Sequence, residues 1–175
     1  MSAVESELRL ARRRDARRIA NLSRDLIETG LGWSWTPKRV ERAISDSETL
    51  GLVAETRIEI VGFGLMEFHT NHAHLTLFAV REAHQRRGLG TRMLEWMTES
   101  ARTAGCDRIV LEVRSTNEGA QRFYERAGYA AEKTLPGYYD GKEAAVRMVN
   151  DLIDPARSEE HTSELQSPCN LVCRL

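Results

Sequence analysis

Residues 80–91 combine glycines, arginines and an amide in a spacing that suits the binding of a phosphate. The segment reads VREAHQRRGLGT, and an apolar run from Leu75 to Val80 comes directly before it. After it, Leu94, Met97 and Ala101 keep the i, i+3, i+7 spacing of an amphipathic helix. The pattern therefore predicts a strand, then a glycine loop, then the N-terminus of a helix.

Such a loop offers an anion several favourable contacts. The first four N–H groups of a helix have no partner within the helix, and the helix dipole places partial positive charge there. Gly88 and Gly90 remove side chains where a ligand must approach the backbone, and the residues just before them supply donors and positive charge. The predicted phosphate or pyrophosphate site consists of Gln85, Arg86, Arg87, Gly88, Leu89, Gly90 and Thr91.

Two common glycine loops do not fit this segment. The nucleoside-triphosphate loop needs GxxxxGK followed by Ser or Thr, and no Lys-Ser or Lys-Thr follows a glycine here. The dinucleotide-binding loop needs GxGxxG, and Met93 stands where the third glycine would be. The spacing Gln-x-x-Gly-x-Gly instead resembles the pyrophosphate loop of the GCN5-related N-acetyltransferase (GNAT) superfamily, whose members bind acetyl-coenzyme A (acetyl-CoA).

A second stretch carries the same resemblance. Residues 111–129 read LEVRSTNEGAQRFYERAGY, which is similar to the superfamily's next block: a strand, Asn-x-x-Ala, then Tyr three residues before Ala-Gly-aromatic. With matching elements across residues 7–152, the chain is identified as a member of this superfamily. The resemblance implies a single-domain α/β fold, with a mixed, mostly antiparallel sheet and helices on both faces. It also implies an acetyl-CoA-dependent N-acetyltransferase.

The resemblance is strongest to the bacterial ribosomal-protein N-terminal alanine acetyltransferases, which also carry Glu in this strand and Tyr twelve residues later. It implies that Glu112 is the general base, acting directly or through water, and that Tyr124 protonates the leaving thiolate. Asn117 matches a position that helps hold the cofactor. The residues whose backbone groups would bind the pantetheine arm are Phe78, Ala79 and Val80, the last also donating to the oxyanion.

These assignments have structural alternatives. Glu112 lies on the polar face of an alternating strand and could be only an exposed carboxylate. Tyr124 keeps helical spacing with Ala120 and Ala127 and could be only a core aromatic, and Asn117 could be only a helix N-cap. The sequence departs from some relatives by placing Thr76 where they carry an acidic base, which favours Glu112 in that role.

The rest of the chain predicts elements that surround these motifs. Helices are expected around Ile19, Leu22 and Leu26, from a Thr36 N-cap and Pro37 to about Ser45, and from Asn117 to Gly128. The strands are expected at residues 8–10, 50–54, 58–68, 74–80, 106–113, 131–135 and 144–152, with a bulge or bend at Gly62 and Gly64. The five arginines between residues 12 and 18 are interpreted as the solvated face of the first helix and not as an RNA-binding arm.

Two aromatic pairs are candidates for the acceptor site. Trp33 and Trp35 lie in a glycine-flanked loop, where they could line an acceptor pocket or close the top of the core. Tyr138 and Tyr139, in a turn expected at residues 136–141, resemble the aromatic turn over the acceptor in relatives that acetylate protein termini. No metal site is expected, because the three histidines at 69, 72 and 74 share no spacing with Cys or a carboxylate and are interpreted as neutral surface residues.

The amino-acid composition limits the classes of binding partner that we expect. The 25 basic and 26 acidic residues give a net charge of −1, so no overall field favours nucleic acid or a membrane surface. No apolar run approaches a spanning helix, and the first residues lack the apolar core of a signal peptide, so we expect a cytoplasmic protein. Three cysteines do not make a disulfide framework, and Cys106 is interpreted as a small buried residue. A monomer and a homodimer both fit the sequence.

The end of the chain departs from this pattern. Residues 157–167 read RSEEHTSELQS, which is what a sequencing-library adapter encodes in this frame, and residues 171–175 fit the continuation of that adapter. We therefore expect an N-acetyltransferase domain at residues 1–156 and a disordered, non-native tail at residues 157–175. The alternative is a disordered natural tail.

The acceptor is expected to be a primary amine. The combination of Glu112, Tyr124 and the tyrosine pair favours a protein N-terminal α-amine over a small-molecule amine such as an amino acid, polyamine or antibiotic. A non-catalytic acetyl-CoA sensor is a further alternative, against which the presence of Tyr124 argues.

Overall fold

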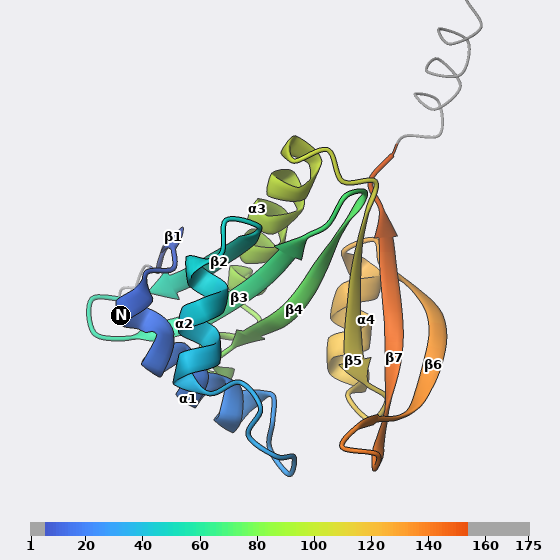
Figure 1. Ribbon diagram of the computed structural model, residues 1–175, viewed down its shortest axis with the longest axis horizontal. Helices are drawn as coiled ribbons and strands as arrows, with labels where there is room; N and C mark the ends of the chain where they lie inside the picture. The colour runs from blue at the N-terminus through green and yellow to red at the C-terminus, as the bar shows by residue number, and fades with distance from the viewer. Residues whose placement is uncertain (1–5, 154–175) are drawn as a thin grey trace, which may run out of the picture.

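A sheet of seven strands separates two layers of helices in the computed structural model, which describes residues 6–153 (Figure 1). The strands follow the order β1-β2-β3-β4-β5-β7-β6. Every neighbouring pair is antiparallel except β4 and β5, which are parallel. The fold is therefore the mixed, mostly antiparallel α/β architecture that the resemblance implies.

The element bounds agree with the expected ranges to within a few residues, with one exception. The strands are β1 (Glu7–Leu10), β2 (Thr49–Glu55), β3 (Ile60–Phe68), β4 (His72–Val80), β5 (Arg108–Arg114), β6 (Ala130–Tyr139) and β7 (Glu143–Asp151). The helices are α1 (Ala16–Leu26), α2 (Pro37–Ser45), α3 (Leu89–Thr103) and α4 (Glu118–Arg126), with 3₁₀ turns at Arg13–Asp15 and Glu82–His84. The exception is the expected turn at residues 136–141, because β6 continues with irregular pairing through Pro136 to Tyr139.

The two faces of the sheet carry separate cores. Helices α1 and α2 cover one face, where Ile19 and Val40 pack with Phe63 of the sheet. Helices α3 and α4 cover the other face, where Met93 and Met97 pack with residues of β2 to β5 and β7. All five arginines between residues 12 and 18 are exposed; Arg17 and Arg18 lie in α1, whereas the other three come before it.

A bulge in β4 changes which face each side chain occupies. The pairing of β3 with β4 skips one residue, Thr76. Before the bulge, Leu75 packs in the core under α3 and α4, whereas Leu77, two residues later, packs in the core under α1 and α2. Because side chains of a regular strand alternate between faces, the extra residue reverses the alternation and turns Phe78 and Val80 toward α3 and α4.

Two glycines of β3 allow α3 to lie close to the sheet. The irregularity expected at Gly62 is confirmed, because the β2–β3 register shifts beside it, whereas Gly64 lies in regular pairing. A methyl group at Gly62 would lie 2.8 Å from the Met93 sulfur, and one at Gly64 would lie 2.7 Å from the Met97 sulfur. These glycines therefore set the position of the helix whose first turn follows the glycine loop.

The tail expected from residue 157 onward lies outside the described residues. Within residues 6–153, no helix is both long enough and apolar enough to cross a membrane.

The contact between α3 and β3 predicts opposite effects for two Gly→Ala substitutions. Gly64→Ala should lower the free energy of unfolding by about 1–3 kcal/mol, because its methyl group meets the Met97 sulfur and, at 3.3 Å, the Phe78 ring. Gly119→Ala, in α4, meets only ordinary contacts and should raise it by about 0.5–1 kcal/mol. Urea unfolding of both variants measures this difference, and equal stability of the two would contradict it.

Candidate active site

The sheet opens between its two parallel strands. β4 and β5 pair only from His72 to Leu75 and from Arg108 to Leu111, although both strands continue further (Figure 1). Over the remaining length, β4 stays paired with β3 and β5 stays paired with β7. The divergence begins at the bulge at Thr76, where a local increase in strand twist is expected. Among residues 6–153, this leaves two facing strand edges whose polar backbone groups have no strand partner across the opening.

The backbone of β4 presents some of its polar groups to this opening. The N–H of Arg81 donates to the carbonyl of Val61 on β3 at 2.8 Å. Since successive residues of a strand point their N–H and C=O groups to opposite sides, Val80 and Phe78 direct theirs toward the opening, and Ala79 toward β3. Of the three residues expected to bind a pantetheine arm, the geometry therefore turns Phe78 and Val80 toward the open edge.

The glycine loop follows the open end of β4. Gln85 uses its side-chain amide to donate to the carbonyl of Val80 at 2.8 Å, so it fixes the path of the loop. Arg86 has a φ of 58° and Gly88 a φ of 77°, and Gly88 is the N-cap of α3. The left-handed conformation at Gly88 is one that glycine adopts without strain. The loop thus turns the chain sharply into the first turn of α3.

The start of α3 leaves donors free for an anion. Within residues 6–153, the N–H groups of Leu89, Gly90 and Thr91 have no hydrogen-bond acceptor, and no side chain caps them. In the same part of the chain, the exposed guanidinium groups of Arg86 and Arg87 have no ion-pair partner. Backbone donors, a helix dipole and two free cations together suit a diphosphate.

An aromatic cluster joins the two halves of the sheet on the α3–α4 side of the opening. Phe78 of β4 stacks on Phe123 of α4 with ring centroids 6.0 Å apart, and it lies 6.3 Å from the ring of Tyr124. A methyl group at Gly90 would lie 3.4 Å from the Phe123 ring, so this glycine lets the first turn of α3 approach α4. The cluster holds Tyr124 beside the opening, near Phe78, with the two rings tilted by 60°.

Tyr124 is nearly completely buried, with 7% of its surface exposed. Burial, with smaller effects from Tyr129 and Tyr139, raises the pKa of its phenol well above the usual value of 10. The phenol is therefore a proton donor throughout the neutral pH range. Its position in the core does not exclude a chemical role, because it also borders the opening through Phe78.

Glu112, the first β5 residue beyond the paired stretch, is bound by two basic side chains. His74 Nε2 lies 2.6 Å from Glu112 Oε2, and Arg147 Nε donates to Glu112 Oε1 at 2.9 Å. Only 5% of the Glu112 side chain is exposed, so it is not the exposed strand carboxylate that was the alternative. Burial alone would raise the pKa of this carboxyl, but the hydrogen bonds and charges of His74 and Arg147 outweigh burial and lower the pKa below its usual value. Glu112 is thus an ionised carboxylate at neutral pH.

The β6–β7 end of the sheet places the tyrosine pair next to Glu112. The Tyr139 hydroxyl donates to the backbone carbonyl of Glu112 at 3.4 Å, and burial first, then Tyr138 and Glu112, raise its pKa to about 12. Tyr138 is 46% exposed, and partial burial and the charge of Glu112 raise its pKa. Both expected acceptor-site tyrosines therefore lie next to Glu112.

The two tryptophans have different surroundings, which separates the two interpretations of their loop. Trp35 is half-buried, packs against the core under α1 and α2, and lies under Arg39 at 4.0 Å. Trp33 is exposed and lies under Arg24 at 5.2 Å. The loop between α1 and α2 is organised by the buried carboxylate of Glu28, which accepts hydrogen bonds from Ser34 and Trp35. Of the two tryptophans, Trp33 has the more exposed side chain.

Arg114, at the end of β5, ties this loop to the rest of the opening. Its guanidinium donates to the carbonyls of Ile27 and Thr29, both at 2.8 Å, and it pairs with Glu143 at 3.3 Å. The N–H of Gly32 also donates to Asp140 at 2.9 Å. The α1–α2 loop and the β6–β7 turn are therefore held together at the mouth of the site.

Asn117 is confirmed as the N-cap of α4, because its side-chain oxygen accepts from the N–H of Ala120 at 3.1 Å. Gln121 of the same helix donates to the carbonyls of Arg114 and Ser115. These bonds fix α4, and with it Tyr124, against the end of β5. The side-chain N–H₂ of Asn117 is not needed for capping.

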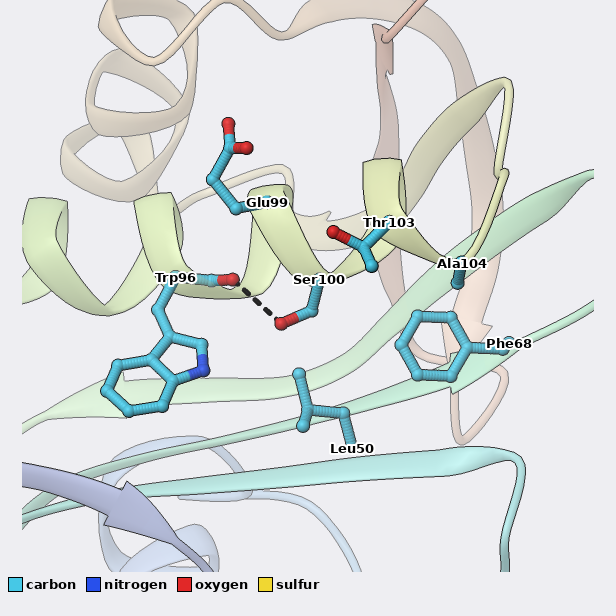
Figure 2. Close-up of a pocket in the computed structure, with 7 residues that line it drawn as sticks. All are labelled: Leu50, Phe68, Trp96, Glu99, Ser100, Thr103 and Ala104. Atoms are coloured by element: carbon cyan, nitrogen blue, oxygen red, sulfur yellow. Dashed lines mark hydrogen bonds between the residues drawn. The ribbon is translucent and has the colours of Figure 1, made fainter.

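An apolar groove of about 580 Å³ lies elsewhere, beside the second half of α3 (Figure 2). Its lining residues are Leu50, Phe68, Trp96, Glu99, Ser100, Thr103 and Ala104. Trp96 and Ser100 are joined by a hydrogen bond from the Ser100 hydroxyl to the Trp96 carbonyl. Because Gly88 is at the opposite end of this helix, the groove is separate from the opening between β4 and β5.

Sequence reasoning missed His74, Arg147 and Arg114. The expectation that the three histidines lie on the surface holds for exposed His69, whose ring stacks on that of His72, but it is wrong for His74, which is 29% exposed and contacts Glu112. The contact between His74 and Glu112 could have been predicted from their places on the same face of two neighbouring parallel strands. That prediction requires the strand register, which the sequence alone does not provide. Among the described residues, no group of three potential metal ligands is close enough to hold an ion.

Comparisons with known proteins identify the family of this chain. The acetyltransferase (GNAT) family matches residues 12–129. An uncharacterised N-acetyltransferase of Methanocaldococcus jannaschii is 38% identical over 98 residues, which are 55% of this chain and 63% of that protein. The ribosomal protein bS18-alanine N-acetyltransferase of Escherichia coli is 31% identical over 93 residues, 51% of this chain and 63% of that protein. The chain thus spans slightly less than two thirds of the length of these two relatives.

Solved structures show the same fold. The ribosomal-protein-S18-alanine N-acetyltransferase of Escherichia coli has a TM-score of 0.74 and 22% identity, covering 86% of this chain and 96% of that one. NAA60 of Arabidopsis thaliana, solved in complex with acetyl-CoA, has a TM-score of 0.75 and 15% identity. The match covers 85% of this chain and 99% of that one. Since the family match also extends over more than half of the sequence, this chain belongs to the GNAT acetyltransferase family.

Proposed function

We propose that this protein is an N-acetyltransferase that moves an acetyl group from acetyl-CoA directly to a primary amine, and that the amine is the N-terminal α-amine of a protein. The observation that carries this proposal is the opening between β4 and β5. It has free N–H groups and arginines at one end and the Glu112 carboxylate at the other. A ligand with a diphosphate and a long arm that ends in a reactive group fits such an opening.

The residues at the open end suit coenzyme A. The diphosphate would be held by the loop and first helical turn, and the N–H and C=O of Phe78 and the N–H of Val80 would face the pantetheine arm as in an added strand. The side-chain N–H₂ of Asn117, not used for capping, is available to the same ligand. The role of Gln85 is to position Val80 through its carbonyl.

Acetyl transfer to an amine makes three chemical demands. The amine must lose a proton before it attacks, the thioester oxygen needs a donor as it becomes an oxyanion, and the thiolate leaves more easily when protonated. The Val80 N–H is proposed as the oxyanion donor and the Tyr124 phenol as the acid. Glu112 is proposed to take part in removing the proton from the amine. A covalent acetyl-enzyme is not required, and burial raises the pKa of Cys106, which disfavours a nucleophilic thiolate.

Two features favour a protein terminus as the acceptor. A protein α-amine has a pKa near 8, against about 10.4 for lysine, so less free energy is needed to deprotonate it. Trp33 and Tyr138 are exposed at the joined α1–α2 loop and β6–β7 turn, where they could contact the first residues of a peptide. The bS18-alanine acetyltransferase relative supports the same class, and it supports the cytoplasmic location expected from the sequence. A small-molecule amine is the second candidate.

The acceptor class can be tested by following thiol release from acetyl-CoA. We expect turnover with pooled peptides that carry a free N-terminus, Ala-terminated ones included. The same peptides with a blocked N-terminus and an internal lysine should be inactive, because the lysine ammonium is harder to deprotonate. Activity confined to pooled small amines would support an acetyltransferase whose acceptor is a small molecule and not a protein terminus. No thiol release with either pool would contradict the proposed function.

Tyr124 can be tested with a substitution that removes only its hydroxyl. Tyr124→Phe should lower kcat about 100-fold, the lower end of the range for a lost general acid, without weakening the binding of acetyl-CoA. Tyr129→Phe is the matched control, because Tyr129 is buried with its ring 5.5 Å from that of Tyr124. Because burial raises the pKa of Tyr124, the wild-type rate should not fall on the alkaline side below about pH 10 through loss of this proton. Equal kcat values in Tyr124→Phe and wild type would remove Tyr124 from the mechanism.

A further inference from the structure

The side chain next to Glu112 is better placed than Glu112 itself to accept a proton from the acceptor. Both oxygens of Glu112 are engaged, one by His74 and one by Arg147, and only 5% of its side chain is exposed. Binding a proton would remove the negative charge that both of these hydrogen bonds stabilise, and this loss is costly in a buried position. His74 is 29% exposed and has one ring nitrogen that is not used in this contact.

The contact also determines which ring nitrogen of His74 can act. An ionised carboxylate only accepts hydrogen bonds, so the nitrogen at 2.6 Å, Nε2, must carry a proton. In the neutral ring the other nitrogen, Nδ1, then holds the free electron pair. No hydrogen bond to Nδ1 is found within residues 6–153, and this atom is not among the buried unpaired ones there. Glu112 therefore both orients the ring and stabilises the cation that forms when Nδ1 binds a proton.

His74 lies where the sheet begins to open. It precedes Leu75, the last β4 residue paired with β5, and Glu112 follows Leu111, the last β5 residue paired with β4. Both side chains lie on the face covered by α1 and α2, where Arg114 and the β6–β7 turn frame the mouth of the site. Tyr124 lies in the core on the opposite face. His74 and Tyr124 thus approach the opening from opposite sides of the sheet.

We propose that His74, oriented by the Glu112–Arg147 pair, is the catalytic base that removes the proton from the acceptor amine. This inference rests on the proposed function. His74 Nδ1 takes one proton from the ammonium group and releases it to solvent through its exposed edge. The neutral nitrogen then forms the C–N bond, the C–S bond breaks, and Tyr124 gives its proton to sulfur. The second proton lost by nitrogen restores the phenol, so the reaction releases one proton overall.

Each strand near His74 carries a charged or titratable side chain that can affect its protonation. Besides Glu112 on β5 and Arg147 on β7, the residue opposite His74 on β3 is Glu67, and His72 lies two residues earlier on β4. The tyrosines of β6 reach the Glu112 side of the pair. His72 is also a histidine of β4, but in the pairing with β5 it lies opposite Arg108. It is therefore the matched control for His74.

The kinetic test compares His74→Gln, Glu112→Gln and His72→Gln across pH. The wild-type kcat/KM should fall on the acid side somewhere between about pH 5 and 8, as expected when a histidine base becomes protonated. His74→Gln should lower kcat about 100-fold, abolish this acid limb and leave the KM for acetyl-CoA within about two-fold. Glu112→Gln should retain an acid limb, and His72→Gln should match wild type. Added imidazole should restore part of the rate of His74→Ala but not that of Glu112→Gln.

A second measurement does not depend on turnover. In ¹⁵N NMR of the wild-type protein, the neutral His74 ring should carry its proton on the nitrogen that faces Glu112, and Glu112→Gln should reduce this preference. The inference is overturned if His74→Gln keeps the acid limb and a rate within three-fold of wild type while Glu112→Gln loses both. It is also overturned if the neutral ring carries its proton on the other nitrogen. Absence of thiol release by wild type with every amine would instead reject the proposed function.

Discussion

The separation of β4 from β5 is the constraint on which the rest of the site depends. A sheet edge must satisfy its N–H and C=O groups, and an edge left open inside a fold is normally covered or paired. Here each of the two strands remains bonded on its outer side, so the opening persists without loss of the sheet. Arg114 and the hydrogen bond from Gly32 to Asp140 hold its mouth, and the aromatic cluster around Phe78 holds its other face. The opening is therefore a built part of the structure.

The electrostatics of the site follow from this arrangement. At the open end, positive charge is left unpaired because α3 begins there and Arg86 and Arg87 have no ion-pair partner in the described part of the chain. At the closed end, the charges are paired, and the pKa of Glu112 is lowered despite burial because His74 and Arg147 come from the two flanking strands. A free cationic end suits recognition of an anion, and a paired, buried end suits orientation of a reacting group.

The parts that could be predicted from the sequence are those that depend on neighbours along the chain. The glycine loop, the Thr36 and Asn117 N-caps and the left-handed Gly128 are local features, and the structure has all of them. The parts that could not be predicted depend on strand register. The contact between His74 and Glu112 spans 38 residues, and it forms only because β4 lies beside β5 in one alignment. The turn expected at residues 136–141 is confined to residues 140–142, because irregular pairing with β7 carries β6 past Pro136 to Tyr139.

One inserted residue connects the register to the chemistry. In a regular strand, His74 and Phe78 would lie on the same face, since they are four residues apart. Because Thr76 is skipped in the pairing with β3, His74 faces the α1–α2 side, where it meets Glu112, and Phe78 faces the α3–α4 side, where it meets Tyr124. The same bulge begins the divergence of β4 from β5. A single backbone irregularity therefore opens the sheet and distributes the proposed base and acid to its two faces, which allows both to reach one ligand lying between the strands.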